Sequence, residues 1–436
     1  MLDQTNPEPI TFTSLMAVSY AVPSTVPEFP LELRYAEGFY ASLVSENVDL
    51  INYGDGRSSL ALAGGKKPQI SYMKRDATGF SLRHAQRGAG GKGWVTQVAS
   101  RRKVHPGKEN AIATDSTGRV SVSHWRDDSV PSPGPTGPPF TGTRELLVST
   151  RGAAGNWHEH LRPLDWDIGA DHSTFPILDS SLAYDSSDEG HLAYIRTFRG
   201  VSAHTSGLFY TVESQAKVWN QPIQMLAQPG PDSQLLSVPH AQIALDSNDK
   251  YHIVYTTWER SANPSVTPTK CFLRYVTNST DAPEVKLIAP LSEDYKTRQG
   301  VGVLNICAVP PTFRPAIAIG RDDTVHVAYH DNGTPENFCE DSGLWYAKRK
   351  RGENWKLRLV DPLGAARDFS IAVGNVGDVT IAYAEPFNDS YRLKFAFSVS
   401  GSSWSFSYPP ENPPRALAKL GDIAVFSSRG RSNFKL

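Results

Sequence analysis

The feature that most constrains the fold of this chain is a short pattern that occurs seven times along it. In residues 315–329 the pattern consists of branched residues at alternate positions, a turn at residues 320–323, and alternate branched residues again up to Tyr329. Alternation of this kind on both sides of a tight turn predicts a β-hairpin. A single hairpin is barely stable in water, so the repeats have to bury their faces against one another.

The first hairpin is followed by two further strand patterns, which sets a repeating unit of four strands. The first strand of every unit carries an alanine after its first branched residue: Ala61, Ala113, Ala183, Ala244, Ala318, Ala372 and Ala418. Small residues at one position predict innermost strands that crowd toward a common axis, where a larger side chain would overpack. The sequence therefore predicts an all-β, seven-bladed β-propeller of four-stranded antiparallel blades.

Two aromatic columns support this prediction. The second strand ends on a ring residue in every unit: Tyr72, His124, Tyr194, Tyr255, Tyr329, Tyr383 and Phe426. A tryptophan opens the fourth strand in five units: Trp94, Trp157, Trp219, Trp355 and Trp404. We expect these rings to fill the wide outer part of the wedge between neighbouring blades.

The two ends of the chain form incomplete units. Residues 32–50 read as strands without a hairpin, whereas residues 416–421 and 423–426 read as a hairpin without outer strands. We therefore expect a strand within residues 32–50 to pair in one sheet with residues 423–426 and close the ring, which removes a free edge. Residues 1–31, which are rich in proline, are expected to lie as an arm on the surface, and residues 32–436 to form one propeller domain.

Composition narrows the classes of partner and location. The 44 Lys and Arg nearly balance the 45 Asp and Glu, so no global field attracts nucleic acid or an anionic membrane. No apolar run reaches the length of a membrane span. The first residues are acidic and broken by proline, unlike a secretory signal, so we expect a cytoplasmic location unless a signal was removed. Cys271, Cys307 and Cys339 have no metal-ligand spacing and are expected to be buried free thiols, although one bridge can form.

The chain resembles the sialidase-like, or BNR-repeat, β-propellers. The resemblance rests on four-stranded units of similar length with Gly-x-x-Trp before the fourth strand, as at Gly91, Gly352 and Gly401. The stretch from Ser398 to Trp404 is closest to the family's Asp-box but has no aspartate, so the resemblance implies the fold rather than sialidase activity. Similar propellers serve as lectins, as polysaccharide lyases, or as pockets for pericyclic and dehydrating steps, and the fold alone does not choose among them.

A ring of polar residues is expected at one mouth of the central channel. The loop that enters a first strand and the loop that leaves a second strand lie on the same face, because the two strands are antiparallel neighbours. Six polar residues stand three positions before the first branched residue of a unit: Arg57, Glu109, Asp179, His240, Arg314 and Asp368. We expect them to bind a ligand, with the alternative that a channel mouth is polar simply because it is wet.

The candidate catalytic residues lie on the same face. His124 is the one imidazole in a column of Tyr and Phe, and a histidine can act as acid or base near neutral pH. Its alternative role is that of a packed ring. The full set of catalytic candidates is His124, Arg126, Arg196 and His240, and the further ligand-binding candidates are Tyr72, Trp125, Trp258 and His330.

Three long loops, residues 127–143, 259–270 and 291–313, rise on this face and could cover the channel. Unequal loops favour one central site. We therefore expect an enzyme, without metal or other cofactor, that binds a small organic molecule at the channel mouth. Its reaction would be an acid–base step such as cyclisation, dehydration or a pericyclic (hetero-Diels–Alder type) reaction in a biosynthetic pathway. The alternatives are a carbohydrate-binding lectin, for which several similar pockets are expected, and a polysaccharide lyase. The expected partner is thus a small-molecule or carbohydrate ligand.

Overall fold

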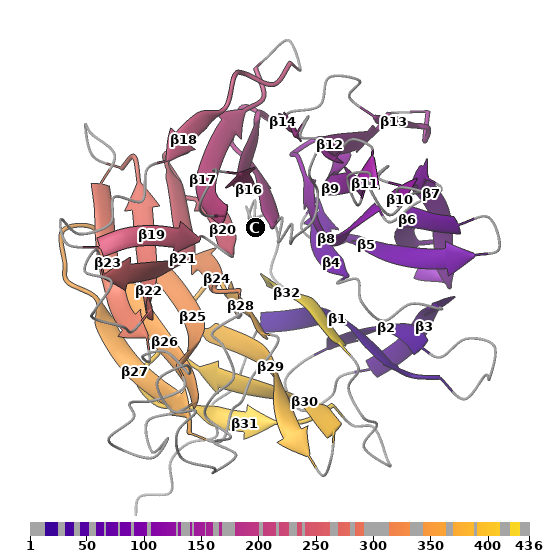
Figure 1. Cartoon of the computed structure of the whole chain (residues 1–436). Helices are drawn as coiled ribbons and strands as arrows, with labels where there is room; N and C mark the ends of the chain where they lie inside the picture. The colour runs from indigo at the N-terminus through magenta and orange to yellow at the C-terminus, as the bar shows by residue number, and fades with distance from the viewer. Residues whose placement is uncertain are drawn as a thin grey trace, which may run out of the picture.

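Seven β-sheets stand around a central axis in the computed structural model, and each forms one blade of a propeller (Figure 1). In the part of the chain that the structure describes, every regular element is a strand. The described residues are 14–24, 31–38, 44–51, 58–64, 67–76, 79–88, 91–102, 106–127, 130–131, 140–141, 144–152, 154–159, 165–167, 179–199, 204–214, 218–225, 233–237, 240–261, 269–279, 284–291, 314–331, 343–362, 369–387, 390–409 and 419–427.

Blades 1 to 3 follow one another along the chain, and each is an antiparallel meander that starts at the axis. Blade 1 contains β4 (Ser59–Ala63), β5 (Lys67–Asp76), β6 (Gly79–Arg87) and β7 (Trp94–Arg102). Blade 2 contains β8 (Pro106–Thr114), β9 (Val120–Asp127), β12 (Arg144–Arg151) and β13 (Trp157–Glu159), with β14 (Asp165–Asp167) also paired to β12. The predicted loop after β9 holds a small hairpin of β10 (Val130–Pro131) and β11 (Phe140–Thr141). Blade 3 contains β15 (Ser180–Tyr184), β16 (Gly190–Arg199), β17 (His204–Val212) and β18 (Ile223–Met225).

Blades 4 to 6 repeat the same plan. Blade 4 contains β20 (Ala241–Leu245), β21 (Tyr251–Ser261), β22 (Thr269–Thr277) and β23 (Glu284–Leu291), and β19 (Ser233–Ser237) pairs with the end of β21. Blade 5 contains β24 (Ala316–Ile319), β25 (Val325–Asp331), β26 (Gly343–Arg349) and β27 (Lys356–Asp361). Blade 6 contains β28 (Phe369–Val373), β29 (Val379–Phe387), β30 (Ser390–Ser398) and β31 (Ser405–Ser407).

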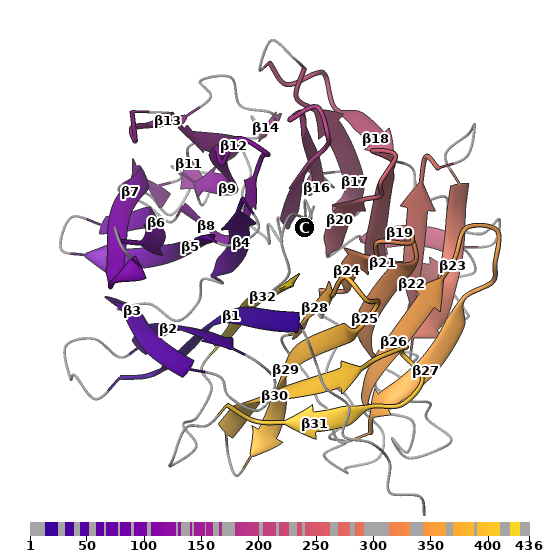
Figure 2. The same ribbon diagram turned by 180° about the vertical axis from the view of Figure 1, so that it is seen from behind.

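Blade 7 joins the two ends of the chain. Its strands, from the outside to the axis, are β3 (Val44–Ile51), β2 (Leu31–Gly38), β1 (Ser14–Pro23) and β32 (Lys419–Ser427). The predicted closure is confirmed, because strands within residues 32–50 share a sheet with residues 423–426. Both views of the ribbon show β32 beside β1 (Figures 1 and 2).

Two details of the predicted closure are wrong. Ser14–Pro23 is a central strand and not a surface arm, since Val18, Tyr20 and Val22 are almost fully buried. Where a hairpin was predicted over residues 416–426, the described part, from residue 419 on, belongs to one strand, β32, which takes the innermost position of the blade. Phe426 therefore lies on an innermost strand and does not belong to the second-strand aromatic column, while Ala418 lies outside the described residues.

The core is divided among the seven interfaces between blades. Each of the seven clusters of buried apolar side chains combines residues from two neighbouring blades, and blade 7 contributes to two of them. Near the axis the six described alanines of the first strands are at most 7% exposed. Each innermost strand contacts the next one around the ring, including β28 with β32 and β32 with β4. A blade is therefore stable only when both of its neighbours are present.

The tryptophan column fills the outer part of these interfaces, as the sequence predicts. Trp94 packs edge-on against Tyr35 of the preceding blade, with ring centroids 5.1 Å apart. Trp355 and Tyr275, and Trp404 and Tyr346, repeat this contact at 5.2 Å with interplanar angles of 81° and 72°. Edge-to-face pairs add to the stability that area burial gives.

Neighbouring blades are also joined through the turns between their first and second strands. In blades 3, 4 and 5 an aspartate in each turn has a positive φ: 60° for Asp188, 61° for Asp249 and 58° for Asp323. The carboxylate of each accepts hydrogen bonds from the backbone N and the hydroxyl of a serine in the preceding blade's turn: Ser116, Ser186 and Ser247. The bridge gives a physical reason for aspartate at a backbone position that ordinarily favours glycine.

We expect Asp249→Ala to lower the free energy of unfolding by about 1 kcal/mol more than Asp249→Gly. Both changes remove the bridge to Ser186, but only alanine adds strain at a φ of 61°. Chemical denaturation of the two variants measures the difference, and equal losses of stability would contradict a strained backbone at this turn.

Candidate functional site

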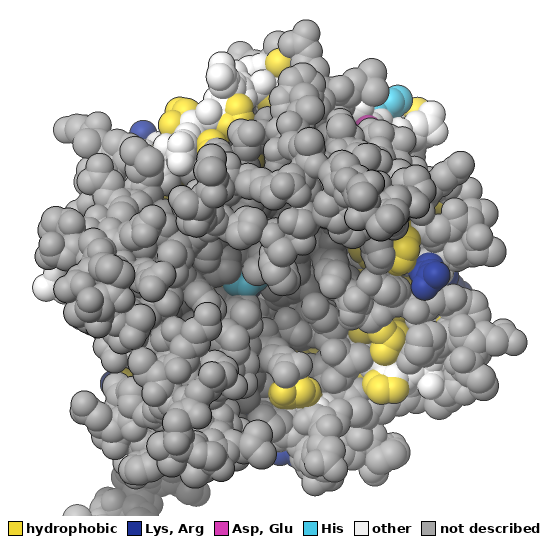
Figure 3. Space-filling view, viewed as in Figure 1, with side chains coloured by type: hydrophobic (Ala, Val, Ile, Leu, Met, Phe, Trp, Pro, Cys, Tyr) yellow, Lys and Arg dark blue, Asp and Glu magenta, His cyan; other side chains and the backbone are white. Residues whose placement is uncertain are grey.

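The central channel is narrow and is lined by both polar and apolar groups. It encloses a cavity of about 100 Å³ lined by first-strand residues of six blades, among them Leu60, Ile112, Ile243 and Ile317. Sites that enclose a drug-sized ligand measure about 300–1,000 Å³. A ligand of that size therefore has to bind at a mouth of the channel. The space-filling view shows a hollow near the centre of one face, with a histidine side chain in it (Figure 3).

Three of the six predicted mouth residues contact one another. Asp179, His240 and Arg314 lie one or two residues before the innermost strands of blades 3, 4 and 5. Nε of Arg314 lies 3.0 Å from Oδ2 of Asp179, and Nδ1 of His240 lies 3.3 Å from the same oxygen. Asp179 is fully buried. We call these three residues the mouth cluster.

Arg314 serves to hold this cluster together. Its guanidinium reaches past blade 4 to donate from Nη2 to the carbonyl oxygen of Ser180 in blade 3, at 2.8 Å. The side-chain oxygen of Gln242, turned toward the guanidinium, accepts from Nε at 2.6 Å and from Nη2 at 3.0 Å. Arg314 is 7% exposed. Its donors are thus directed mainly at protein groups, and its role is to fix the carboxylate of Asp179.

His240 is the member of the cluster that reaches solvent, with 12% of its side chain exposed. Because Asp179 is an acceptor, the Nδ1–H of His240 donates to it, and Nε2 then carries the lone pair. An imidazole held in this way by a carboxylate can accept and return a proton. The mouth cluster is therefore equipped for acid–base chemistry.

His124, the first catalytic candidate, is fully buried in blade 2. Its Nε2 lies 2.9 Å from Oγ of Ser149 on the adjacent strand β12. This geometry matches the packing role that the sequence left open as the alternative. A catalytic role for His124 stays a prediction.

Three ligand-binding candidates lie in the interfaces between blades. Tyr72 is 1% exposed and donates from its hydroxyl to Oδ2 of Asp49 in blade 7, at 2.6 Å. Trp125 is 5% exposed and belongs to the core between blades 2 and 3. His330 is 7% exposed and occupies the repeat position of Trp125 in blade 5. Their role in ligand binding stays a prediction.

The structure does not describe the side chains of the remaining predicted site residues. Arg57 and Asp368 lie outside the described residues. The description covers only the backbone of the others, which lie on β8, β9, β16 and β21: Glu109, Arg126, Arg196 and Trp258. The side chain of Cys271 and the whole of Cys307 and Cys339 are likewise outside it.

The sequence missed two clamps between blades in which a carboxylate joins a tyrosine and a lysine. Asp49 of blade 7 accepts from Tyr72 and pairs with Lys74 of blade 1 at 2.8 Å. Asp361 of blade 5 accepts from Tyr383 and pairs with Lys394 of blade 6 at 2.7 Å. In the sequence, only the recurrence of tyrosine at the end of the second strands pointed to these contacts. Burial, reinforced by these carboxylates, raises the pKa of both tyrosines, which therefore keep their protons and donate.

Two classes of feature are absent from the described residues. No three His, Cys, Asp or Glu side chains there come together as metal ligands. A helix with the length and hydropathy of a membrane span is also not found in them.

Comparison with known proteins identifies the fold. No protein-family model matches the chain, and no curated protein matches its sequence. The structure is similar to that of the polysaccharide lyase Uly1, with 9% identity, a TM-score of 0.53, and coverage of 89% of this chain and 88% of that chain. It is also similar to the GH93 α-L-arabinofuranosidase of Fusarium graminearum with arabinobiose, with 12% identity, a TM-score of 0.50, and coverage of 95% and 98%. The microbial sialidase Hz136 aligns at 10% identity and a TM-score of 0.37, covering 88% of this chain and 67% of that chain.

The predicted resemblance to sialidase-like seven-bladed propellers is confirmed at the level of the fold. Since the two structures with the higher TM-scores are described as a lyase and an arabinofuranosidase, the fold does not select a reaction.

We expect Asp179→Asn to lower the free energy of unfolding by about 3–5 kcal/mol, because it leaves the buried charge of Arg314 without its partner. Chemical denaturation measures the loss. As a control, Glu353→Gln removes the exposed ion pair with Lys356 and should have no measurable effect. Similar effects of the two changes would show that the mouth ion pair is not buried.

Stability should also fall with acidification, and His330 contributes to this. Burial lowers the pKa of His330 from 6.5 to about 4. Below pH 6.5 the unfolded chain therefore binds a proton that the folded protein does not. Stability is lost by about 1.4 kcal/mol per pH unit for each such histidine until the folded pKa is reached.

Replacement of this histidine tests the pH dependence. Met73 fills the same repeat position in blade 1, so His330→Met should keep the packing and reduce the slope of stability against pH between pH 6.5 and 4. Denaturation curves across this range provide the measurement. An unchanged slope in the variant would mean that His330 is already protonated in the folded protein.

Proposed function

We propose that the chain is a carbohydrate-active enzyme that performs acid–base chemistry at the channel mouth. His240 is the residue that transfers the proton, Asp179 orients its ring, and Arg314 fixes Asp179. The observation that carries this proposal is the buried contact of Asp179 with both Arg314 and His240, which prepares one partly exposed imidazole at the channel mouth.

The narrowness of the channel supports a ligand that lies across the mouth. A cavity of about 100 Å³ has no room for a sugar ring with its shell of hydroxyl groups. An extended saccharide can lie over the opening with one residue next to His240. The carbohydrate class is supported by the similar fold of Uly1 and of the arabinofuranosidase, both of which are named for activity on saccharides.

Elimination is the reaction class that the described residues support best. Hydrolysis of a glycosidic bond ordinarily requires two carboxyl groups that flank the bond. The carboxylate of the mouth cluster is fully buried and bound to Arg314, so it is not available for that role. An imidazole base can instead remove the proton next to the carboxylate of a uronic acid residue. The electron pair of that C–H bond then forms the new double bond as the adjacent C–O bond breaks. The abstracted proton is held on the imidazolium, and the leaving oxygen takes up a proton from this imidazolium or from solvent water.

The test is turnover of uronate-containing polysaccharides, followed by the ultraviolet absorbance of the unsaturated product. We expect activity on one member of a panel of alginate, polygalacturonate, ulvan and chondroitin sulfate. His240→Gln should lower kcat by about 10²–10⁴ with an unchanged melting temperature, because it removes the proton acceptor and keeps a polar side chain.

The matched control is His158→Gln, which changes an exposed imidazole on the outer strand of blade 2. It should leave turnover unchanged. Full activity of His240→Gln would remove His240 from the reaction. Binding of saccharides at several blades without any turnover would instead identify a lectin.

A further inference from the structure

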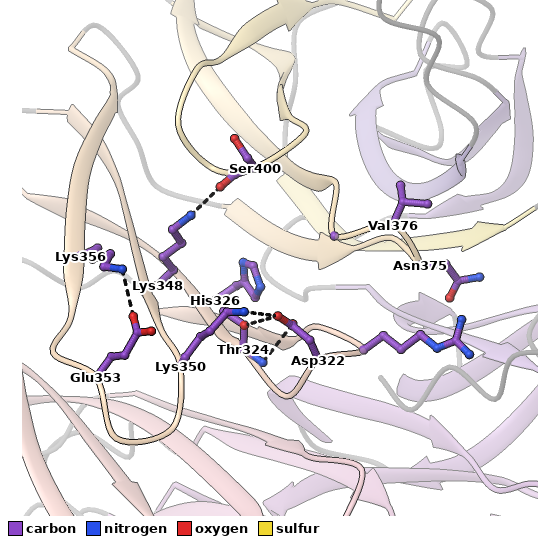
Figure 4. Close-up of a pocket in the computed structure, with 12 residues that line it drawn as sticks. Asp322, Thr324, His326, Lys348, Lys350, Glu353, Lys356, Asn375, Val376 and Ser400 are labelled. Carbon is purple, nitrogen blue, oxygen red and sulfur yellow. Dashed lines mark hydrogen bonds and ion pairs between the residues drawn. The ribbon is translucent and has the colours of Figure 1, made fainter.

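A second pocket lies on the face opposite the mouth cluster, between the turns of blades 5 and 6. Its volume is about 470 Å³. The residues that line it come from the β24–β25 and β26–β27 turns of blade 5, the ends of the adjoining strands, and two turns of blade 6, and they include Arg321, Asp322, His326, Lys348, Lys350 and Val376 (Figure 4). We call it the turn-face pocket. Because it is built entirely from described residues, its chemistry can be derived from the structure.

Beside the pocket, blade 5 lacks an aspartate that blades 3 and 4 place next to a histidine. In blade 3, Nε2 of His191 lies 3.1 Å from Oδ2 of Asp185, and in blade 4 the same atoms of His252 and Asp246 are 3.2 Å apart. His326 occupies the equivalent position in blade 5, opposite Ala318. The residue equivalent to the aspartate is Gly320, and no hydrogen bond joins Nε2 of His326 to a carboxylate of the described residues, although the exposed side chain of Asp322 lies nearby.

His326 presents a donor to this space. Its ring is 5% exposed, and its Nδ1 lies 2.6 Å from the hydroxyl of Tyr346. Burial raises the pKa of Tyr346, so the hydroxyl keeps its proton and donates to Nδ1. The Nε2 atom then carries the hydrogen, as it does where His191 and His252 face an aspartate. In blade 5 this N–H points into the turn-face pocket.

The charge of the lining is positive. Four cations line the pocket, Arg321, Lys348, Lys350 and Lys356, against two carboxylates, Asp322 and Glu353, which leaves an excess of two positive charges. The carboxylates pair with Lys350 at 3.0 Å and with Lys356 at 2.9 Å. The ammonium group of Lys348 donates to the carbonyl oxygen of Ser400 at 2.6 Å and keeps its charge uncompensated. Arg321 forms no ion pair with another described residue and supplies the second excess charge.

We propose that the turn-face pocket binds a small organic molecule through a phosphate monoester group. Such a group carries a charge of about −1.5 to −2 near neutral pH and has several acceptor oxygens. These properties match two excess cations and the N–H of His326. The volume exceeds that of a phosphate group and falls within the range of about 300–1,000 Å³ for small-molecule sites, which leaves room for an organic body. This site is independent of the reaction proposed for the channel mouth.

The first test uses inorganic phosphate as the probe and the imidazole resonances of protein labelled at histidine as the readout. Phosphate should shift the resonance of His326, assigned with His326→Gln, and leave those of His191 and His252 in place, because aspartates occupy the equivalent space in their blades. An unmoved His326 resonance, or equal shifts of all three histidines, would overturn the proposal.

Two variants and one control connect this signal to the pocket. Arg321→Ala should weaken phosphate binding by about tenfold, since a charge-assisted hydrogen bond is lost. Gly320→Asp restores the carboxylate of blades 3 and 4 and should abolish binding. A Cβ atom at this position would meet Oδ1 of Asp322 at 3.0 Å and Nε2 of His326 at 3.1 Å, and the exposed side chain of Asp322 can move aside. If Gly320→Asp does not fold, Arg321→Ala decides the outcome alone.

Lys250→Ala removes an exposed cation from the corresponding turn of blade 4 and changes the net charge by the same amount. It should alter the affinity by less than about twofold, because exposed charges outside the pocket are screened. An equal loss of affinity in Lys250→Ala and Arg321→Ala would show general attraction of anions and overturn the site.

A final comparison tests the organic part of the ligand. Glucose 6-phosphate should bind more tightly than inorganic phosphate, glucose should not bind, and glucose 6-sulfate should bind more weakly, since it carries less charge. Equal affinity for inorganic phosphate and glucose 6-phosphate would reduce the pocket to an inorganic anion site and contradict the proposal of an organic ligand.

Discussion

Closure of the ring is the constraint on which the rest of this structure depends. The two ends of the chain meet in blade 7, where β1 and β32 pair in antiparallel register from Ser14 with Ser427 to Ala21 with Lys419. This pairing gives blade 7 its innermost strand and gives blades 6 and 1 a common neighbour. Because the apolar core is distributed over the interfaces between blades, an open ring would expose the faces of two blades and leave a free sheet edge.

The candidate sites arise where single blades depart from the repeat. Asp179, His240 and Arg314 occupy the same repeat position in three consecutive blades, and their different chemistry allows them to bind one another. Gly320 stands where blades 3 and 4 have Asp185 and Asp246, so His326 lines the turn-face pocket without the aspartate contact that His191 and His252 make. The repeat supplies a rigid frame in which such departures are held at fixed positions.

The repeat made much of the fold predictable from the sequence. The alanine and tryptophan columns have the same physical role in several blades, so each copy supports the reading of the others. Strand β1 was missed because it lies among prolines, although its antiparallel partner β2 follows it along the chain. Its large residues Met16, Val18, Tyr20 and Val22 alternate with small ones and share one buried face. Its other partner, β32, is separated from it by almost the entire chain.

The sites were less predictable, for a related reason. Position in the repeat brought Asp179, His240 and Arg314 to one mouth, but it did not reveal that Arg314 spans blade 4 to reach Ser180. That contact depends on the length of one side chain and the order of three blades around the axis. At Gly320 the sequence indicated only a turn. The effect of this glycine becomes visible only when the hydrogen-bond partners of His326 are compared with those of His191 and His252, which each contact an aspartate.

Hydrogen exchange of the intact chain tests ring closure most directly, because amides in a paired strand exchange only when that part of the structure opens. The account predicts that amides of β1 and β32 exchange as slowly as those of β20 and β21 and open together with them. Rapid exchange in β1 and β32, with continued protection of β20 and β21, would contradict a ring closed by the two ends of the chain.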